Sequence, residues 1–158
     1  MREKIVGIDQ NYFADTLYGV LTFVGIYLLN FLIPGISVIG VPSLQSITSE
    51  TGKAIVILAL APIFENFFFF GIVLFLFYDK MKLSFIVSAI LSSTAFLLFH
   101  VSAYGNFASA SGSYLTAGIM AMVFSYQTKL TNSLLPSVVT HALLNFSIAY
   151  LSSAVVIW

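Results

Sequence analysis

The chain has 158 residues, of which 59% are hydrophobic and only 8% are charged. Soluble domains carry roughly 25% charged residues, so the composition and a mean hydropathy of +1.03 predict an integral membrane protein with membrane lipid as its surroundings. The six basic and six acidic residues balance, which excludes nucleic acid as a partner because phosphate binding needs an excess of Lys and Arg. The absence of cysteine excludes disulfides and thiolate chemistry.

Five apolar stretches are predicted to cross the bilayer, which takes about 20 residues as a helix. They cover about 13–33, 54–78, 83–102, 114–127 and 134–158, the fourth being the weakest. Segment 35–52 is rich in Ser, Gly and Pro and is predicted to be a loop, and segment 103–113 is predicted to be a small-residue linker in which the fourth helix could begin. The expected fold is all-α, a polytopic membrane helix bundle of about five transmembrane helices in one domain over 1–158.

The distribution of Lys and Arg predicts the orientation, since cytoplasmic loops carry an excess of both. With the N-terminus in the cytoplasm, only Lys53 lies outside, whereas five basic residues lie inside: Arg2, Lys4, Lys80, Lys82 and Lys129. We therefore expect a protein of the cell (plasma) membrane with its N-terminus in the cytoplasm and its C-terminus outside.

Apart from Asp15, in the polar lead at the start of the first span, three ionisable side chains lie inside predicted spans, where a central charge costs at least ~2.5 kcal/mol. They are Glu65 in the second span, His100 in the third and His141 in the fifth. Asn145 lies one helical turn after His141, on the same face. Each residue alone could form a helix–helix hydrogen bond. As a set they are more simply explained by one shared polar cavity that excludes lipid, and they are the candidate functional residues.

These residues lie in three motifs that resemble those of the CPBP family, the CAAX protease and bacteriocin-processing family of intramembrane endopeptidases. The family motifs are EExxxR (often EExxFRG), FxxxH and HxxxN, in this order. The corresponding segments here are Glu65-Asn66-Phe67-Phe68-Phe69-Phe70-Gly71, Phe96-Leu97-Leu98-Phe99-His100 and His141-Ala142-Leu143-Leu144-Asn145. The resemblance implies a family-like core over about 54–150.

Two positions depart from the family pattern. Asn66 stands where the family has its second Glu, and Phe70 stands where it has Arg. One acid and one base are lost together, which suggests that a structural ion pair was replaced jointly. The four residues usually assigned to the chemistry are all present.

The resemblance implies that Glu65, with His100, binds and deprotonates a water molecule, and that His141 and Asn145 donate hydrogen bonds to the developing oxyanion. Some catalogues describe the family as metalloproteases, and Glu65, His100 and His141 could ligate zinc. These ligands would come from three helices without an HExxH motif. We therefore favour a glutamate mechanism with no metal and no cofactor.

Three functions are consistent with the sequence. The first is an intramembrane endopeptidase that acts on a peptide or a lipidated protein. The second is a catalytically inactive relative that serves as a structural or regulatory subunit among partner subunits of a membrane complex, which the departures at Asn66 and Phe70 would suit. The third is a proton-coupled carrier with Glu65 as its relay, although the sequence has no second intramembrane acid and no inverted repeat to support it.

Overall fold

A computed structural model describes residues 11–32, 50–104 and 111–147, and within these ranges the regular structure is entirely helical. The first helix is α1 (Tyr12–Leu32), and the last three are α4 (Phe85–Tyr104), α5 (Ser111–Thr131) and α6 (Leu135–Phe146). Between α1 and α4 lies one continuous helix, here called the long helix. Its consecutive segments are α2 (Glu50–Ile55), η1 (Val56–Leu60), α3 (Ala61–Glu65), η2 (Asn66–Val73) and η3 (Leu76–Lys80), the η segments being π-helical. The prediction of an all-α fold is confirmed.

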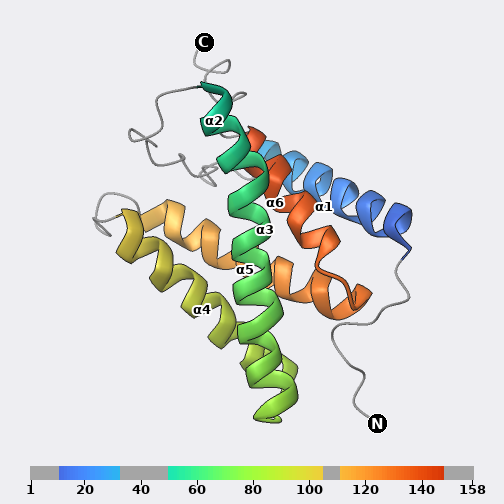
Figure 1. The fold of residues 1–158 in the computed structure, drawn as a ribbon, viewed down its shortest axis with the longest axis vertical. Coiled ribbons are helices and arrows are strands. Elements are labelled where there is room, and N and C mark those ends of the chain that lie inside the picture. The colour runs from blue at the N-terminus through green and yellow to red at the C-terminus, as the bar shows by residue number, and fades with distance from the viewer. Residues whose placement is uncertain (1–10, 33–49, 105–110, 148–158) are drawn as a thin grey trace.

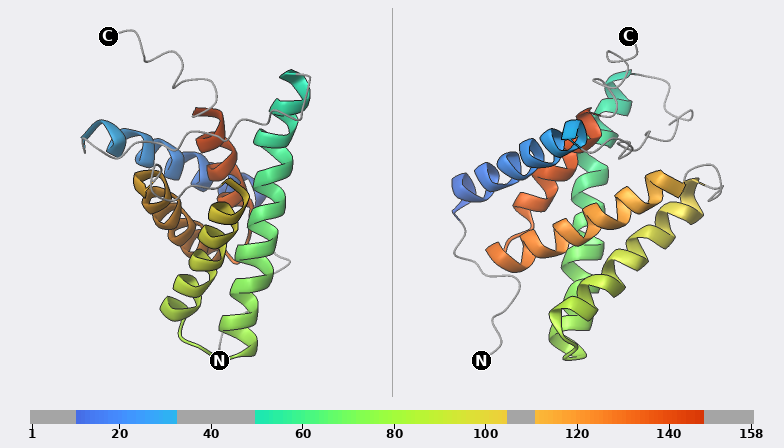
Figure 2. Two further views of the ribbon diagram at one scale, coloured as in Figure 1. Left: turned by 90° about the vertical axis from the view of Figure 1, so that its left-hand side faces the viewer. Right: turned by 180° about the vertical axis from the view of Figure 1, so that it is seen from behind.

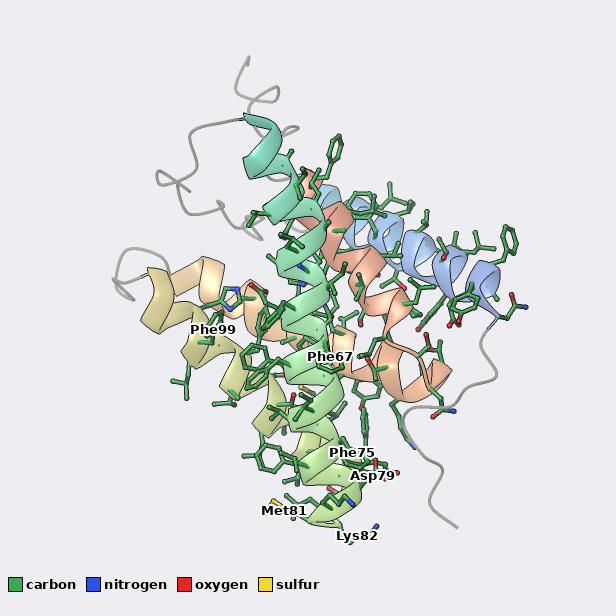
Figure 3. All side chains as sticks on the ribbon, viewed as in Figure 1. Phe67, Phe75, Asp79, Met81, Lys82 and Phe99 are labelled. Carbon is green, nitrogen blue, oxygen red and sulfur yellow. The ribbon has the colours of Figure 1, made fainter. Side chains whose placement is uncertain are left out.

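The long helix runs along the longest dimension of the molecule. In Figure 1, α4 lies to its left and α1 and α6 lie to its right, while α5 crosses behind it from one side to the other, as the rear view in Figure 2 also shows. The long helix ends at a tight turn that contains Met81 and Lys82, whose side chains lie at the end of the molecule farthest from α2 (Figure 3). Lys82 adopts a left-handed backbone conformation with φ 60°, and Asn132, in the turn between α5 and α6, does the same with φ 52°. The first turn brings α4 back against the long helix, and the second brings α6 back against α5.

The part of the long helix from Leu58 to Lys80 is, in the portion of the chain that the structure describes, the one helix long and apolar enough to cross a membrane. Shorter apolar helical stretches cover Tyr12–Ile26, Phe85–His100 and Leu135–Phe146. Large apolar side chains point outward on several helices; Phe13 is 79% exposed and Phe64 76%. Extensive apolar exposure is unusual for a soluble monomer, so this surface suits an apolar environment.

A cluster of buried aromatic rings forms the core at the middle of the bundle. It joins the long helix to α4, α5 and α6 and consists of Phe69, Phe70, Phe96, Ala117, Ala121, Phe124 and Leu144. The Ser92 hydroxyl donates a hydrogen bond to the Phe69 carbonyl oxygen and thereby links α4 to the long helix. The Lys129 ammonium donates to the Tyr78 hydroxyl at 3.2 Å, which brings the last turn of α5 beside the last turns of the long helix. The core therefore fixes the position of every helix that carries a candidate residue.

Helix α1 packs closely against α6 through Gly19. A Cβ atom at this position would lie 2.8 Å from the Pro136 carbonyl oxygen, so only glycine permits the approach. The Thr140 hydroxyl donates to the Gly19 carbonyl oxygen at 2.9 Å, and the Gln127 side-chain amide donates to the Thr140 hydroxyl at 2.8 Å. Helices α1, α5 and α6 are thus joined by buried hydrogen bonds as well as by close packing.

Several predicted boundaries differ from the structure. In the described residues the long helix begins at Glu50, inside the predicted loop 35–52. An acidic residue in the first turn of a helix is favoured by the helix dipole. The rest of the predicted loop, up to residue 49, lies outside the described residues. The linker predicted over 103–113 is too long, because α4 continues to Tyr104 and α5 begins at Ser111. Its Ala and Ser residues cost little in a helix. Residues 148–158 of the last predicted span lie outside the described ranges.

Candidate active site

Side chains from three helices meet where α3 passes into η2. Glu65 is the last residue of α3, His100 lies in the last turns of α4, and His141 lies in the middle of α6. The Glu65 Oε2 atom lies 3.7 Å from Nε2 of His100 and 3.7 Å from Nε2 of His141. All three side chains are largely shielded, with exposed fractions of 12%, 19% and 9% respectively. The structure therefore brings together three of the four residues that the sequence singled out.

The long helix is widened on both sides of Glu65. Pro62, one turn before it, has no backbone N–H to donate, and the π-helical segments η1 and η2 lie before and after α3. Such wide turns are often found at functional sites because they change the direction in which side chains point. Here Glu65 and Asn66 face α4 and α6, whereas Phe64 and Phe67 point outward with exposed fractions of 76% and 55%; Phe67 marks the middle of the long helix in Figure 3.

His100 is held by the residue one turn before it. Its Nδ1 atom lies 2.9 Å from the Phe96 carbonyl oxygen, and the two rings are 4.1 Å apart between centroids. A carbonyl oxygen only accepts hydrogen bonds, so Nδ1 carries the proton and a neutral ring has its lone pair on Nε2. That nitrogen faces Glu65. The FxxxH spacing thus has a physical basis, because Phe96 fixes both the orientation and the tautomer of His100.

His141 is buried and contacted on three sides. Its ring stacks on the Phe124 ring at 5.1 Å with an interplanar angle of 19°, and the Phe96 ring lies edge-on at 6.2 Å. The Asn66 Nδ2 atom lies 2.8 Å from His141 Nδ1 and 2.7 Å from the Pro62 carbonyl oxygen. From the sequence, Asn66 stands out only as the loss of a carboxylate. Its contact with His141 joins residues 75 positions apart and could not be predicted from the sequence. The only sequence feature that could have marked Asn66 as a site residue is its position next to Glu65.

Phe70 fills the position at which the family motif has Arg. It is completely buried, and its ring lies 5.6 Å from that of Phe96 and 5.5 Å from that of Phe124. Phe124 in turn stacks on His141. An aromatic ring here extends the core up to the candidate site, and the neutral Asn66 one turn earlier needs no counter-charge. Position 70 is therefore part of the buried apolar core of this protein.

Asn145, the fourth candidate, lies one turn after His141 on α6 and is partly buried. The helix therefore presents both residues on one face.

Within the described ranges, no group of three or more His, Cys, Asp or Glu side chains is arranged to hold a metal ion.

The fold and the site together define an all-helical protein with a Glu–His–His centre in its core. The family model for "Type II CAAX prenyl endopeptidase Rce1-like" matches residues 48–147, which is well over half of the chain and includes all three motifs. The chain belongs to this family of membrane-embedded endopeptidases, and the resemblance stated from the sequence is confirmed. Comparisons with curated proteins and with solved structures give no significant match.

Proposed function

We propose that the chain is an intramembrane endopeptidase in which Glu65 activates a water molecule to hydrolyse a peptide bond. The observation that supports this most directly is the position of the Glu65 carboxylate, 3.7 Å from Nε2 of both histidines. Direct N–H···O hydrogen bonds span about 2.7–3.2 Å. Polar groups slightly farther apart than this are commonly bridged by water, so the spacing suits a water molecule or substrate carbonyl shared by the three side chains.

In the proposed reaction, the water oxygen attacks the carbonyl carbon of the scissile bond while its proton passes to Glu65. The lone pair on His100 Nε2 accepts a hydrogen bond from the same water and orients it. The carbonyl oxygen becomes an oxyanion, which accepts hydrogen bonds from His141 and Asn145. When the tetrahedral intermediate collapses, the C–N bond breaks and the proton held by Glu65 passes to the leaving amine. The mechanism requires no Ser or Cys nucleophile, no metal and no cofactor.

We further propose that the five helices cross the cell membrane as a single domain over 1–158, with the N-terminus in the cytoplasm and the C-terminus outside. The outward apolar side chains support burial in lipid. The contact between Lys129 and Tyr78 supports the orientation, because it places Lys129 at the end of the bundle that also carries Lys80. Both basic residues were assigned to the cytoplasmic side by their loops.

The substrate class that fits this site is a membrane-anchored peptide or a lipidated protein. The name of the family refers to prenylated CAAX proteins. Phe64, Phe67 and Phe68, next to Glu65 in the chain, are 76%, 55% and 46% exposed and form an apolar surface beside the candidate site. A lipid anchor could lie on this surface while the peptide reaches Glu65.

A second candidate function is that of an inactive relative serving as a subunit of a membrane complex. The specific observation in its favour is the replacement of two family residues by Asn66 and Phe70. Purification at fixed stoichiometry with other membrane proteins, without proteolysis, would support it.

The two functions are separated by an assay of the purified chain in liposomes. The substrates would be a library of single-span peptides and prenylated tail peptides, with products identified by mass spectrometry. We expect cleavage by the wild type and not by Glu65→Gln. Glu50→Gln, about 22 Å away along the same helix at ~1.5 Å per residue, is the matched control and should cleave normally. Absence of cleavage of every peptide by correctly folded wild type would refute the endopeptidase proposal.

A further inference from the structure

Asn66 is a completely buried amide that binds two acceptors at once. Its Nδ2 atom lies 2.7 Å from the Pro62 carbonyl oxygen and 2.8 Å from His141 Nδ1. The atom facing the Pro62 carbonyl must be a donor, so it is the amide nitrogen. The reversed amide would place its oxygen 2.7 Å from another oxygen. The reversed amide would also put its two N–H groups where Oδ1 now lies. Oδ1 has no hydrogen-bond partner among the described residues, so those N–H groups would find no acceptor there. The orientation of the amide is therefore fixed.

This orientation determines which nitrogen of His141 carries the proton. One N–H of Asn66 is donated to Pro62, and the other points at His141 Nδ1. That nitrogen must then offer a lone pair, because a proton on it would face the proton of the amide. The proton of neutral His141 therefore lies on Nε2, the atom 3.7 Å from Glu65 Oε2. The two histidines thus present opposite groups to Glu65, a lone pair from His100 and an N–H from His141.

We propose that Asn66 is a positioning residue that fixes His141 in the tautomer whose Nε2–H can donate to the carbonyl oxygen of the substrate. This inference rests on the proposed function. The stacked ring of Phe124 and the edge of Phe96 set the plane of the imidazole, and neither can choose between its two tautomers. The amide of Asn66 makes that choice. A carboxylate at position 66, without the arginine that accompanies it in the family motif, would instead accept a hydrogen bond from Nδ1–H and leave Nε2 without a proton.

The tautomers can be observed directly by ¹⁵N NMR of the protein labelled at histidine and purified in detergent micelles. The chain has only two histidines, so the spectrum contains two rings. We expect a protonated Nε2 and a pyridine-type Nδ1 for His141, and the reverse for His100. The variant His100→Gln retains only the signals of His141 and assigns them. A proton on Nδ1 of His141 in the wild type would overturn the proposal.

Two near-isosteric variants separate this role from simple packing. Asn66→Leu removes both hydrogen bonds, so the His141 signals should show loss of the single tautomer. In Asn66→Asp the carboxylate accepts from Nδ1, so the proton should move from Nε2 to Nδ1. A wrong histidine tautomer lowers kcat by about 10⁴ in a Ser-His-Asp triad, and we expect Asn66→Asp to lower kcat by about 10²–10⁴ with little change in KM.

Retention of the wild-type His141 tautomer in both variants, or of the wild-type kcat in Asn66→Asp, would refute the proposal. If a variant does not fold, the wild-type spectrum still decides. Absence of cleavage by the wild type would refute the proposed function instead, and the NMR measurement of the Asn66–His141 pair would stand independently of it.

Discussion

Replacing Phe70 by Arg, the residue that the family motif carries at this position, should strongly destabilise the protein. Phe70 is completely buried, and its ring contacts those of Phe96 and Phe124. Each aromatic pair contributes about 0.5–1.5 kcal/mol beyond its buried area, and an unpaired buried charge costs about 3–5 kcal/mol. Phe70→Arg should therefore lower the free energy of unfolding by at least about 4 kcal/mol. Phe70→Leu loses the two aromatic pairs without adding a charge, and as the control it should cost only about 1–3 kcal/mol.

A double-mutant cycle of the wild type, Asn66→Glu, Phe70→Arg and the double variant tests whether positions 66 and 70 changed together. They lie one helical turn apart, so Asn66→Glu can pair with Arg introduced at position 70. The double variant should be more stable than the sum of the two single changes predicts, by about 1–3 kcal/mol. Unfolding in detergent, followed by circular dichroism for all four proteins, gives this coupling energy. Additivity within about 0.5 kcal/mol would refute the idea that Asn66 and Phe70 jointly replace an ion pair.

Two further predictions concern helix packing and metal dependence. Gly19→Ala should destabilise the protein by about 1–3 kcal/mol, because the added Cβ would lie 2.8 Å from the Pro136 carbonyl oxygen. The control Gly25→Ala, whose Cβ would have nothing within 4 Å, should be neutral or stabilising by about 0.5–1 kcal/mol. Equal shifts of the melting temperature in the two variants would contradict the close α1–α6 contact. Cleavage should persist in 1,10-phenanthroline, because only one of the two site histidines offers a lone pair at Nε2 and a catalytic zinc takes three protein ligands. Inhibition that is reversed by added zinc would show this inference to be wrong.

Much of the fold could be predicted from the sequence because apolar runs of membrane length leave few alternatives to a helix. All five predicted stretches contain a described helix. The errors fall at the ends, where Ala, Ser and Gly give no clear signal for helix or loop, as at Tyr104 and Ser111. The π-helical turns around Glu65 could not be predicted, because they depend on how the long helix packs against its neighbours.

The site was predictable only in part, for a similar reason. Glu65, His100 and His141 stand out because ionisable groups are rare in apolar helices. The part played by Asn66 could not be read from the sequence. It results from a contact with His141 on another helix, and the motif comparison marked the position only as the loss of a carboxylate. Likewise, Phe124 carries no motif, and its stacking on His141 is visible only in the folded chain.

The role of Glu65 as the general base that activates water is decided by the rate of peptide cleavage by Glu65→Gln. The measurement compares single-turnover rates in liposomes for wild type, Glu65→Gln and Glu50→Gln at equal amounts of folded protein. General acid–base catalysis contributes about 10²–10⁴-fold, or ~2.7–5.4 kcal/mol of transition-state stabilisation. We predict a loss of this size for Glu65→Gln and none for Glu50→Gln. A wild-type rate in Glu65→Gln would show that Glu65 is not the general base.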